Sequence, residues 1–209
     1  MKKLLLILLS AASVCAAQAP TSELSETMTT YRDGCLKMLE ALRQQDKFSM
    51  YEAKELFARV DIDWLKVPLR DPAMEADADK PDIWFCTEYA DRLLRNNFEF
   101  IRVDEASPLR TFATADLLVL HQTVRPGKSL EYAVPDVSGH CEAMLLAASG
   151  DGLLLSVTDS GNGRTYEGHT DRSTACSSVV WEMSAPEREI ILKVENPSDE
   201  AVSFVLAIN

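Results

Sequence analysis

The polar side chains best suited to ligand binding are concentrated in one segment, from Asp159 to Asp171. Four of them carry oxygen atoms of the kind that calcium prefers, and a histidine lies among them. Their spacing differs from that of an EF-hand loop, and Asn162-Gly163 is typical of a hairpin turn. The turn is the simpler interpretation, and a calcium-stabilised or ligand-binding loop is the alternative. The candidate residues of this loop are Asp159, Asn162, Glu167, His169 and Asp171.

Signatures of catalysis are missing from the sequence. Neither G-x-S-x-G nor S-x-x-K occurs, and His121, His140 and His169 are too far apart for a helical H-E-x-x-H zinc motif. We therefore predict no catalytic residue, and an enzyme is the less favoured class. The alternative is a hydrolase of envelope polymers that uses a pair of carboxylates, with Asp61 and Asp63 among the candidates.

Three tryptophans are candidates for stacking against sugars. Trp84 lies beside an apolar helical stripe and Trp181 lies in an alternating strand pattern, so both are expected in the core. Trp64 follows an irregular acidic segment, and we expect it to be the most exposed of the three. Trp64 therefore joins the candidate ligand-binding residues.

Four cysteines follow residue 20, two in each half of the chain. If the halves fold separately and the protein is exported, Cys35–Cys86 and Cys141–Cys176 are the natural disulfides. The alternative is four buried thiols, because free cysteine packs as a small hydrophobe. The absence of a C-x-x-C motif argues against a redox pair or a zinc ribbon.

The first residues predict export. Lys2 and Lys3 precede a short apolar run and then small residues that end in Ala17-Gln18-Ala19, which is the pattern of a signal peptide over residues 1–19. Lipidation at Cys15 is disfavoured because the residues before it do not form a lipobox. No later segment is long and apolar enough to be expected to span a membrane. We expect a periplasmic or extracellular location.

The charge of the chain restricts its partners. The sequence has 33 acidic and 21 basic residues, which give a formal net charge of −12. Such a chain repels the phosphates of nucleic acid and of anionic membranes, so neither is an expected partner. Proteins and glycans remain open as partners, and the oligomeric state is open as well.

Two hydrophobic periods divide the rest of the chain. Residues 20–110 show a helical period of 3.6, including a six-turn stripe, a helix starting at a Ser49–Glu52 capping box and a third helix with Pro81 in its first turn. Residues 111–209 alternate with a period of 2 and are punctuated by turn signals. We expect an α+β protein in which a domain of three or four helices precedes an antiparallel, jelly-roll-like β-sandwich domain. The stripe consists of Leu24, Met28, Tyr31, Cys35, Met38 and Leu42.

Four segments of the second half carry a family resemblance. They are LEYAVP at 130–135, GDGLLLSVTDSG at 150–161, IILKVEN at 190–196 and SFVLAI at 203–208. In this order they resemble the bacterial pre-peptidase C-terminal domain, an exported β-sandwich, over about residues 116–209. The resemblance implies an accessory module that assists binding, secretion or solubility. The family's usual aspartate in the strand after Gly-Asp is replaced here by leucines, so calcium binding is not carried over.

The leading hypothesis is an exported, acidic, non-enzymatic envelope protein that binds a protein or glycan partner and needs no cofactor. A hydrolase acting through acidic residues and a calcium-stabilised accessory module are the two alternatives.

Overall fold

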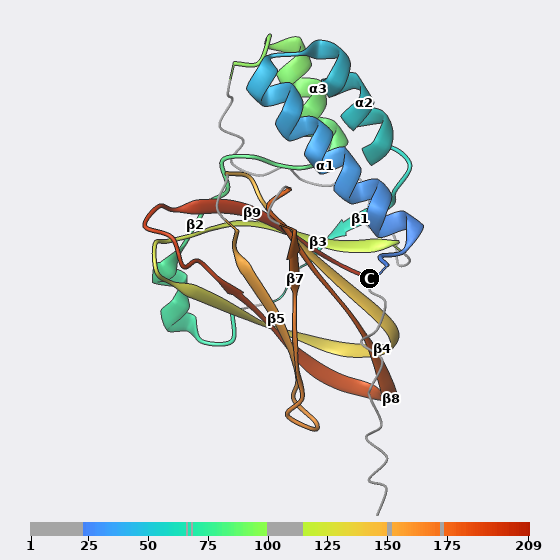
Figure 1. Cartoon of the computed structure of the whole chain (residues 1–209), viewed down its shortest axis with the longest axis vertical. Coiled ribbons are helices and arrows are strands. Elements are labelled where there is room, and N and C mark those ends of the chain that lie inside the picture. Colours follow the sequence, from blue (N-terminus) through green and yellow to red (C-terminus); the bar gives the residue numbers. More distant parts are fainter. Residues whose placement is uncertain (1–22, 66, 68, 100–114, 150–151, 172–173) are drawn as a thin grey trace, which may run out of the picture.

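Three layers make up the part of the chain that the computed structural model describes, which is residues 23–65, 67, 69–99, 115–149, 152–171 and 174–209. Helices α1 to α3 lie together over one sheet of a β-sandwich, and the second sheet lies beyond it (Figure 1). The predicted class, helices followed by a β-sandwich, is confirmed. The predicted signal peptide and Cys15 lie outside the described residues.

Helix α1 (Glu26–Gln44) follows the predicted stripe. It begins at Ser25, whose hydroxyl oxygen accepts a hydrogen bond from the backbone amide of Met28 at 3.2 Å. Met28, Tyr31, Cys35 and Met38 are fully buried, so this face of the helix belongs to the core. None of the helices in the described residues is long and apolar enough to cross a membrane.

Helix α2 (Lys47–Phe57) begins earlier than predicted. The carboxylate of Asp46 accepts the backbone amides of Phe48 and Ser49, both at 3.0 Å, and therefore caps the helix. Ser49 instead donates its hydroxyl to Asp46, so the predicted capping box at Ser49 is wrong. Gly34 of α1 allows close contact with α2, because a Cβ there would lie 2.9 Å from the ring of Phe57.

The segment between α2 and the sandwich is more regular than predicted. It contains strand β1 (Ile62–Trp64), the 3-10 helix η1 (Pro72–Asp77) and the short strand β2 (Ala78–Asp79), although the sequence around Trp64 looks irregular. Helix α3 (Thr87–Arg95) begins after Pro81, so the prediction that this proline lies in its first turn is wrong.

A long antiparallel ribbon of two strands forms the frame of the sandwich. Strand β4 (Ser129–Ala147) pairs with β8 (Cys176–Glu195) along almost its whole length, with register shifts between Val134 and Gly139. One half of the ribbon continues through β8 to β5 (Leu154–Asp159) and β6 (Thr165–Glu167). The other half continues through β4 to β9 (Val202–Ile208) and β3 (Leu117–Val124), and it pairs through β8 with β7 (His169–Asp171). The shifts mark where the ribbon passes from one sheet to the other.

The first half of the chain contributes two strands to the sheet. Strand β1 pairs with β3 in parallel, and β2 pairs with β3 antiparallel. The sheet is therefore mixed, whereas the sequence predicted antiparallel pairing throughout. The departure arises because β1 and β2 come from a segment without the alternating pattern of the later strands.

Two apolar cores lie on opposite faces of the central strands. The first core joins the helices to one face of the sheet, and the second fills the sandwich. Every residue of β9 is buried, because Val205 and Ala207 face the helices while Phe204 and Leu206 face the sandwich. The helical stripe and the sheet thus share one core.

No disulfide joins the four described cysteines, all of which are buried, so the predicted pairs Cys35–Cys86 and Cys141–Cys176 are wrong. Cys141 lies in the sandwich core, whereas Cys176 lies in the core under the helices, so the sheet separates this pair. Cys35 and Cys86 share the helical core but pack there as unbridged apolar side chains. Burial raises the pKa of the Cys86 thiol to about 12 and that of the Cys176 thiol to about 11.

Candidate binding groove

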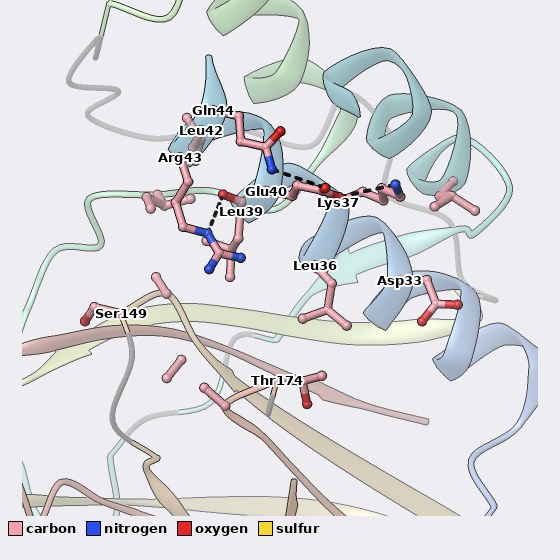
Figure 2. Close-up of a pocket in the computed structure, with 15 residues that line it drawn as sticks. Asp33, Leu36, Lys37, Leu39, Glu40, Leu42, Arg43, Gln44, Ser149 and Thr174 are labelled. Atoms are coloured by element: carbon pink, nitrogen blue, oxygen red, sulfur yellow. Dashed lines mark hydrogen bonds and ion pairs between the residues drawn. The ribbon is translucent and has the colours of Figure 1, made fainter. Parts of the chain in front are cut away.

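A hollow of about 1260 Å³ lies between α1 and the strand ends of β4 and β8. We call it the α1 groove. Figure 2 shows Leu36 and Arg43 extending from α1 toward a wall that includes Ser149 and Thr174. The groove exists because α1 uses one stripe for the core and presents a neighbouring apolar stripe to this space.

The apolar lining of the groove is aliphatic. Leu36, Leu39 and Leu42 of α1 are half-buried and lean against the core under the helices. Ile83 and Ala148 add apolar surface from the segment before α3 and from the end of β4. No aromatic side chain is among the described residues that line the groove. The lining therefore suits aliphatic groups better than sugar rings, which stack on aromatic faces.

Charged side chains form the rim of the groove along α1. Lys37 is neutralised, since its ammonium lies 3.2 Å from the carboxylates of both Glu40 and Glu52. The hydrogen bond with Glu52 is the main cause that raises the pKa of Lys37. Arg43 is different: its Nε donates to the carbonyl oxygen of Leu39 at 3.3 Å, and no acidic residue in the described part of the chain forms an ion pair with it. Arg43 thus presents an unpaired guanidinium to the groove.

A second hollow of about 640 Å³ continues the α1 groove toward the start of α1. The two hollows share Leu36 and Thr174, so they lie next to each other along α1. His169 and Asp171 of β7 line the second hollow, with Arg32 of α1 on its other side. Of the predicted ligand-binding residues, these two line the second hollow, and the other four line neither of the two hollows described.

The other residues of the predicted loop lie elsewhere. Asp159 is buried and accepts the backbone amide of Gly161 at 2.8 Å, while Asn162 accepts that of Arg164 at 2.7 Å. These bonds build the β5–β6 turn, so the predicted hairpin turn is present. Glu167 is exposed at the end of β6. Within the described residues, no group of three or more His, Cys, Asp or Glu side chains is placed to hold a metal ion.

Gly168 lies where residues 165–171 change their strand partner from β5 to β8. It separates β6, which pairs with β5, from β7, which pairs with β8. A Cβ at Gly168 would overlap the hydroxyl of Ser177 and lie 3.0 Å from the carbonyl oxygen of Leu155. This close approach marks the point where the chain passes from β6 to β7, whose His169 lines the second hollow.

Trp64 is half-buried, as is Trp84, whereas Trp181 is buried. The indole of Trp64 packs edge-on against Trp84, with ring centroids 5.3 Å apart, and against His121 at 4.9 Å. The backbone amide of Phe85 donates to Nε2 of His121 at 2.9 Å. Burial lowers the pKa of His121 to about 3, so the imidazole is neutral in this aromatic cluster. Strand β1, which carries Trp64, pairs with β3, which carries His121, and the local sequence does not reveal this contact.

A second polar cluster surrounds His140. Its Nδ1 lies 2.7 Å from Glu182, and its Nε2 lies 3.3 Å from the buried carboxylate of Glu142. The hydrogen bond with Glu182 is the main cause that raises the pKa of His140. The carboxylate of Glu142 also accepts the backbone amide of Ser25. These contacts fix α1 to the sheet, so we assign this cluster a structural role.

Comparison with known proteins assigns this chain to no family. No protein family matches the sequence, and no curated protein matches it. Among solved structures, 33 chains match. One is the pre-peptidase C-terminal domain of a collagenase from Bacillus anthracis, which is 11% identical over 44% of this chain and 87% of that domain, with a TM-score of 0.37. The resemblance noted in the sequence is thus present and weak.

Other solved structures differ in what they do. PliG from Aeromonas hydrophila, a periplasmic inhibitor of g-type lysozyme, is 14% identical over 49% of this chain and 92% of its own, with a TM-score of 0.36. A family two carbohydrate esterase from Cellvibrio japonicus is 11% identical over 44% of this chain and 30% of its own, with a TM-score of 0.28. These likenesses support no specific function.

The sequence did not reveal the groove. Leu36 and Leu39 were the available signal, because they form an apolar stripe beside the one that was assigned to the core. The opposite wall comes from Ala148 and Thr174, more than 100 positions further along the chain.

Proposed function

We propose that this chain is an exported, non-enzymatic binding protein, and that its α1 groove holds an extended segment of a partner protein. The unpaired guanidinium of Arg43 beside an aliphatic surface is the observation that carries the proposal. The chain has a net charge of −12, so acidic side chains are plentiful, yet none in the described residues pairs with Arg43. Its guanidinium is therefore available to an acidic group of a partner. It fits a carboxylate, because guanidinium–carboxylate hydrogen bonds are strong and directional.

The dimensions of the two hollows support a chain segment as the occupant. The α1 groove has about 1260 Å³ and continues into the second hollow of about 640 Å³. Sites for small molecules usually have roughly 300–1,000 Å³. Two adjacent hollows of this size suit several consecutive residues, with aliphatic side chains against Leu36 and Leu39 and an acidic residue at Arg43.

The nature of the lining favours a protein over a glycan. Sugar sites usually present an aromatic face, and the described lining residues include none. The indole nitrogens of Trp64 and Trp181 are buried, and the Trp64 ring packs against Trp84 and His121. The groove offers aliphatic contacts and one cation instead.

A peptide-display selection on the whole protein tests the proposal. We expect selected peptides to place Asp or Glu beside aliphatic residues. Arg43→Glu should weaken their binding by about tenfold or more, since a charged hydrogen bond contributes roughly 1.5–3 kcal/mol. Leu39→Ser should also weaken binding, because it removes apolar contact area.

Arg59→Glu is the matched control. Arg59 is exposed, lies outside the groove and forms no ion pair with another described residue, so its reversal changes net charge equally. Peptide binding should survive this change. Binders that are indifferent to both Arg43→Glu and Leu39→Ser would refute the proposal. So would a screen in which only glycans bind.

A further inference from the structure

Two aromatic side chains stand exposed side by side on α2. Phe48 is 69% exposed and Tyr51 is 56% exposed, and they are three positions apart on one face of the helix. They are the largest of the four exposed hydrophobic side chains in the described residues. Adjacent exposed aromatic residues are typical of a contact surface.

Charged residues flank Tyr51 symmetrically. Lys47 lies four positions before Tyr51 and Glu55 lies four positions after it, and both are exposed. Because side chains four apart lie on one face, the three form a ridge of about 12 Å along the helix. Another charged residue of α2 forms an ion pair within the chain, since Lys54 lies 2.7 Å from Asp91. Neither Lys47 nor Glu55 forms an ion pair with another described residue.

The placement of these two charges does not stabilise the isolated helix. Lys47 is the first residue of α2, and Glu55 lies in its last turn. A helix dipole favours the opposite arrangement, with acidic residues at the start and basic residues at the end. A second copy of α2 packed antiparallel against the first would make these charges favourable, since it brings each Lys47 beside Glu55 of the other copy.

We propose that α2 is an interface with a second copy of this chain. The two helices cross antiparallel about a twofold axis at Tyr51, so that each Lys47 faces Glu55 of the second copy. This pairing of i±4 ridges corresponds to a common packing mode of helices. A twofold contact requires a self-complementary surface, and the ridge has this property because Tyr51 is its midpoint.

The rest of the molecule leaves this face available. The buried side of α2, formed by Ser49, Met50, Ala53 and Phe57, packs toward α1 and α3. The α1 groove does not include the ridge, so dimerisation and groove binding are independent. One helix of 11 residues buries less than the roughly 800 Å² per partner of a typical stable complex. The dimer is therefore weak and depends on concentration.

Sedimentation velocity of the full protein tests the interface. The protein concentration is varied from about 1 µM to about 1 mM, which covers the dissociation constants of weak complexes. The wild-type protein should shift from monomer to dimer, and high salt should weaken the dimer. Lys47→Glu alone and Glu55→Lys alone should each remain monomeric, because each places like charges together twice. An equimolar mixture of the two variants should dimerise again, since opposite charges then meet at both positions.

The mixture also controls for folding, because a misfolded variant cannot restore a dimer. Arg92→Glu, an exposed reversal on α3, should leave dimerisation unchanged. A wild-type protein that is monomeric throughout the range would overturn the proposal. A dimer that survives either single reversal, or a mixture that stays monomeric, would overturn it equally.

Discussion

The carboxylate of Glu142 accepts the backbone amide of Ser25 with both oxygens, at 3.0 and 2.9 Å, across 117 positions of the chain. Ser25 is the N-cap of α1, and Glu142 lies in β4 with 1% of its surface exposed. A buried carboxylate thus lies at the positive end of the helix dipole and satisfies an amide there. This bond attaches α1, the helix that forms the groove, to the sheet.

Glu142→Gln should destabilise the protein. The amide keeps one acceptor oxygen but loses the charge that faces the start of the helix and His140. We expect a loss of about 1–3 kcal/mol, the usual range for a buried hydrogen bond to a charged group. Urea unfolding measures this change. Glu182→Gln is the control: Glu182 is mostly exposed, so its loss should have a small effect. Equal stability of the wild type and Glu142→Gln would contradict the structural role.

His121 should make the protein sensitive to acid. Its pKa falls from 6.5 in the unfolded chain to about 3 in the folded state because burial disfavours the charged imidazole. The unfolded state therefore binds a proton first, and the stability due to neutral His121 is lost as the pH falls below 6.5. At pH 5 the wild type should have lost roughly 2 kcal/mol for this reason, at 1.36 kcal/mol per pH unit.

His121→Gln removes this proton linkage while it keeps an acceptor for the amide of Phe85. The variant should therefore lose less stability than the wild type between pH 7 and pH 5. Parallel urea titrations at each pH measure the difference. His169→Gln, at an exposed position outside the aromatic cluster, is the matched histidine substitution. Identical slopes for the wild type and His121→Gln would show that the imidazole is not buried as described.

Gly168→Ala should lower the melting temperature. The added methyl group would overlap Ser177 and lie 3.0 Å from the carbonyl oxygen of Leu155, which is backbone and cannot rotate away. Overpacking of this kind destabilises by about 1–3 kcal/mol. For a chain of this length, each kcal/mol corresponds to about 2–4 °C. Ser177→Ala in the same chain should restore part of the loss, and no restoration would mean that the contact with Leu155 dominates.

The four thiols should be unreactive in the native protein. All are buried, and burial raises the pKa of each, including Cys141 to about 11, so little thiolate forms at neutral pH. With Cys15→Ser, Ellman's reagent should count four thiols in denaturant and react slowly without it. Fewer than four in denaturant, together with a mass deficit, would reveal a disulfide and contradict the structure.

Sequence pattern predicted the elements of the fold well where one face of each element is buried. The stripe through Met28, Tyr31 and Cys35 marked α1 correctly, because helical spacing and burial agree there. Alternation marked the later strands for the same reason. The start of α2 was missed because Asp46 and Ser49 are both good capping residues, and only the folded geometry selects Asp46.

The candidate site was much harder to predict. His169 and Asp171 were chosen for their chemistry, and they do line a hollow, but their neighbours Asp159 and Asn162 serve the turn. Arg43 was not singled out at all. Its importance depends on its having no ion pair with a described residue, since the nearby Glu40 pairs with Lys37 instead. Such pairing is decided by the folded geometry rather than by local sequence.

Strand β9 has a consequence for how the chain reaches this structure. Strands β3 and β4 each pair with β9, so it fills the place between them. Residues 202–208 are the last of the described strands to leave the ribosome. Until these residues are available, β3 and β4 have no strand between them, and both apolar cores lack the side chains of β9. The two cores must therefore assemble late and together, through contacts between distant parts of the chain, which are slow to form. A chaperone that binds apolar segments has its longest opportunity during that interval.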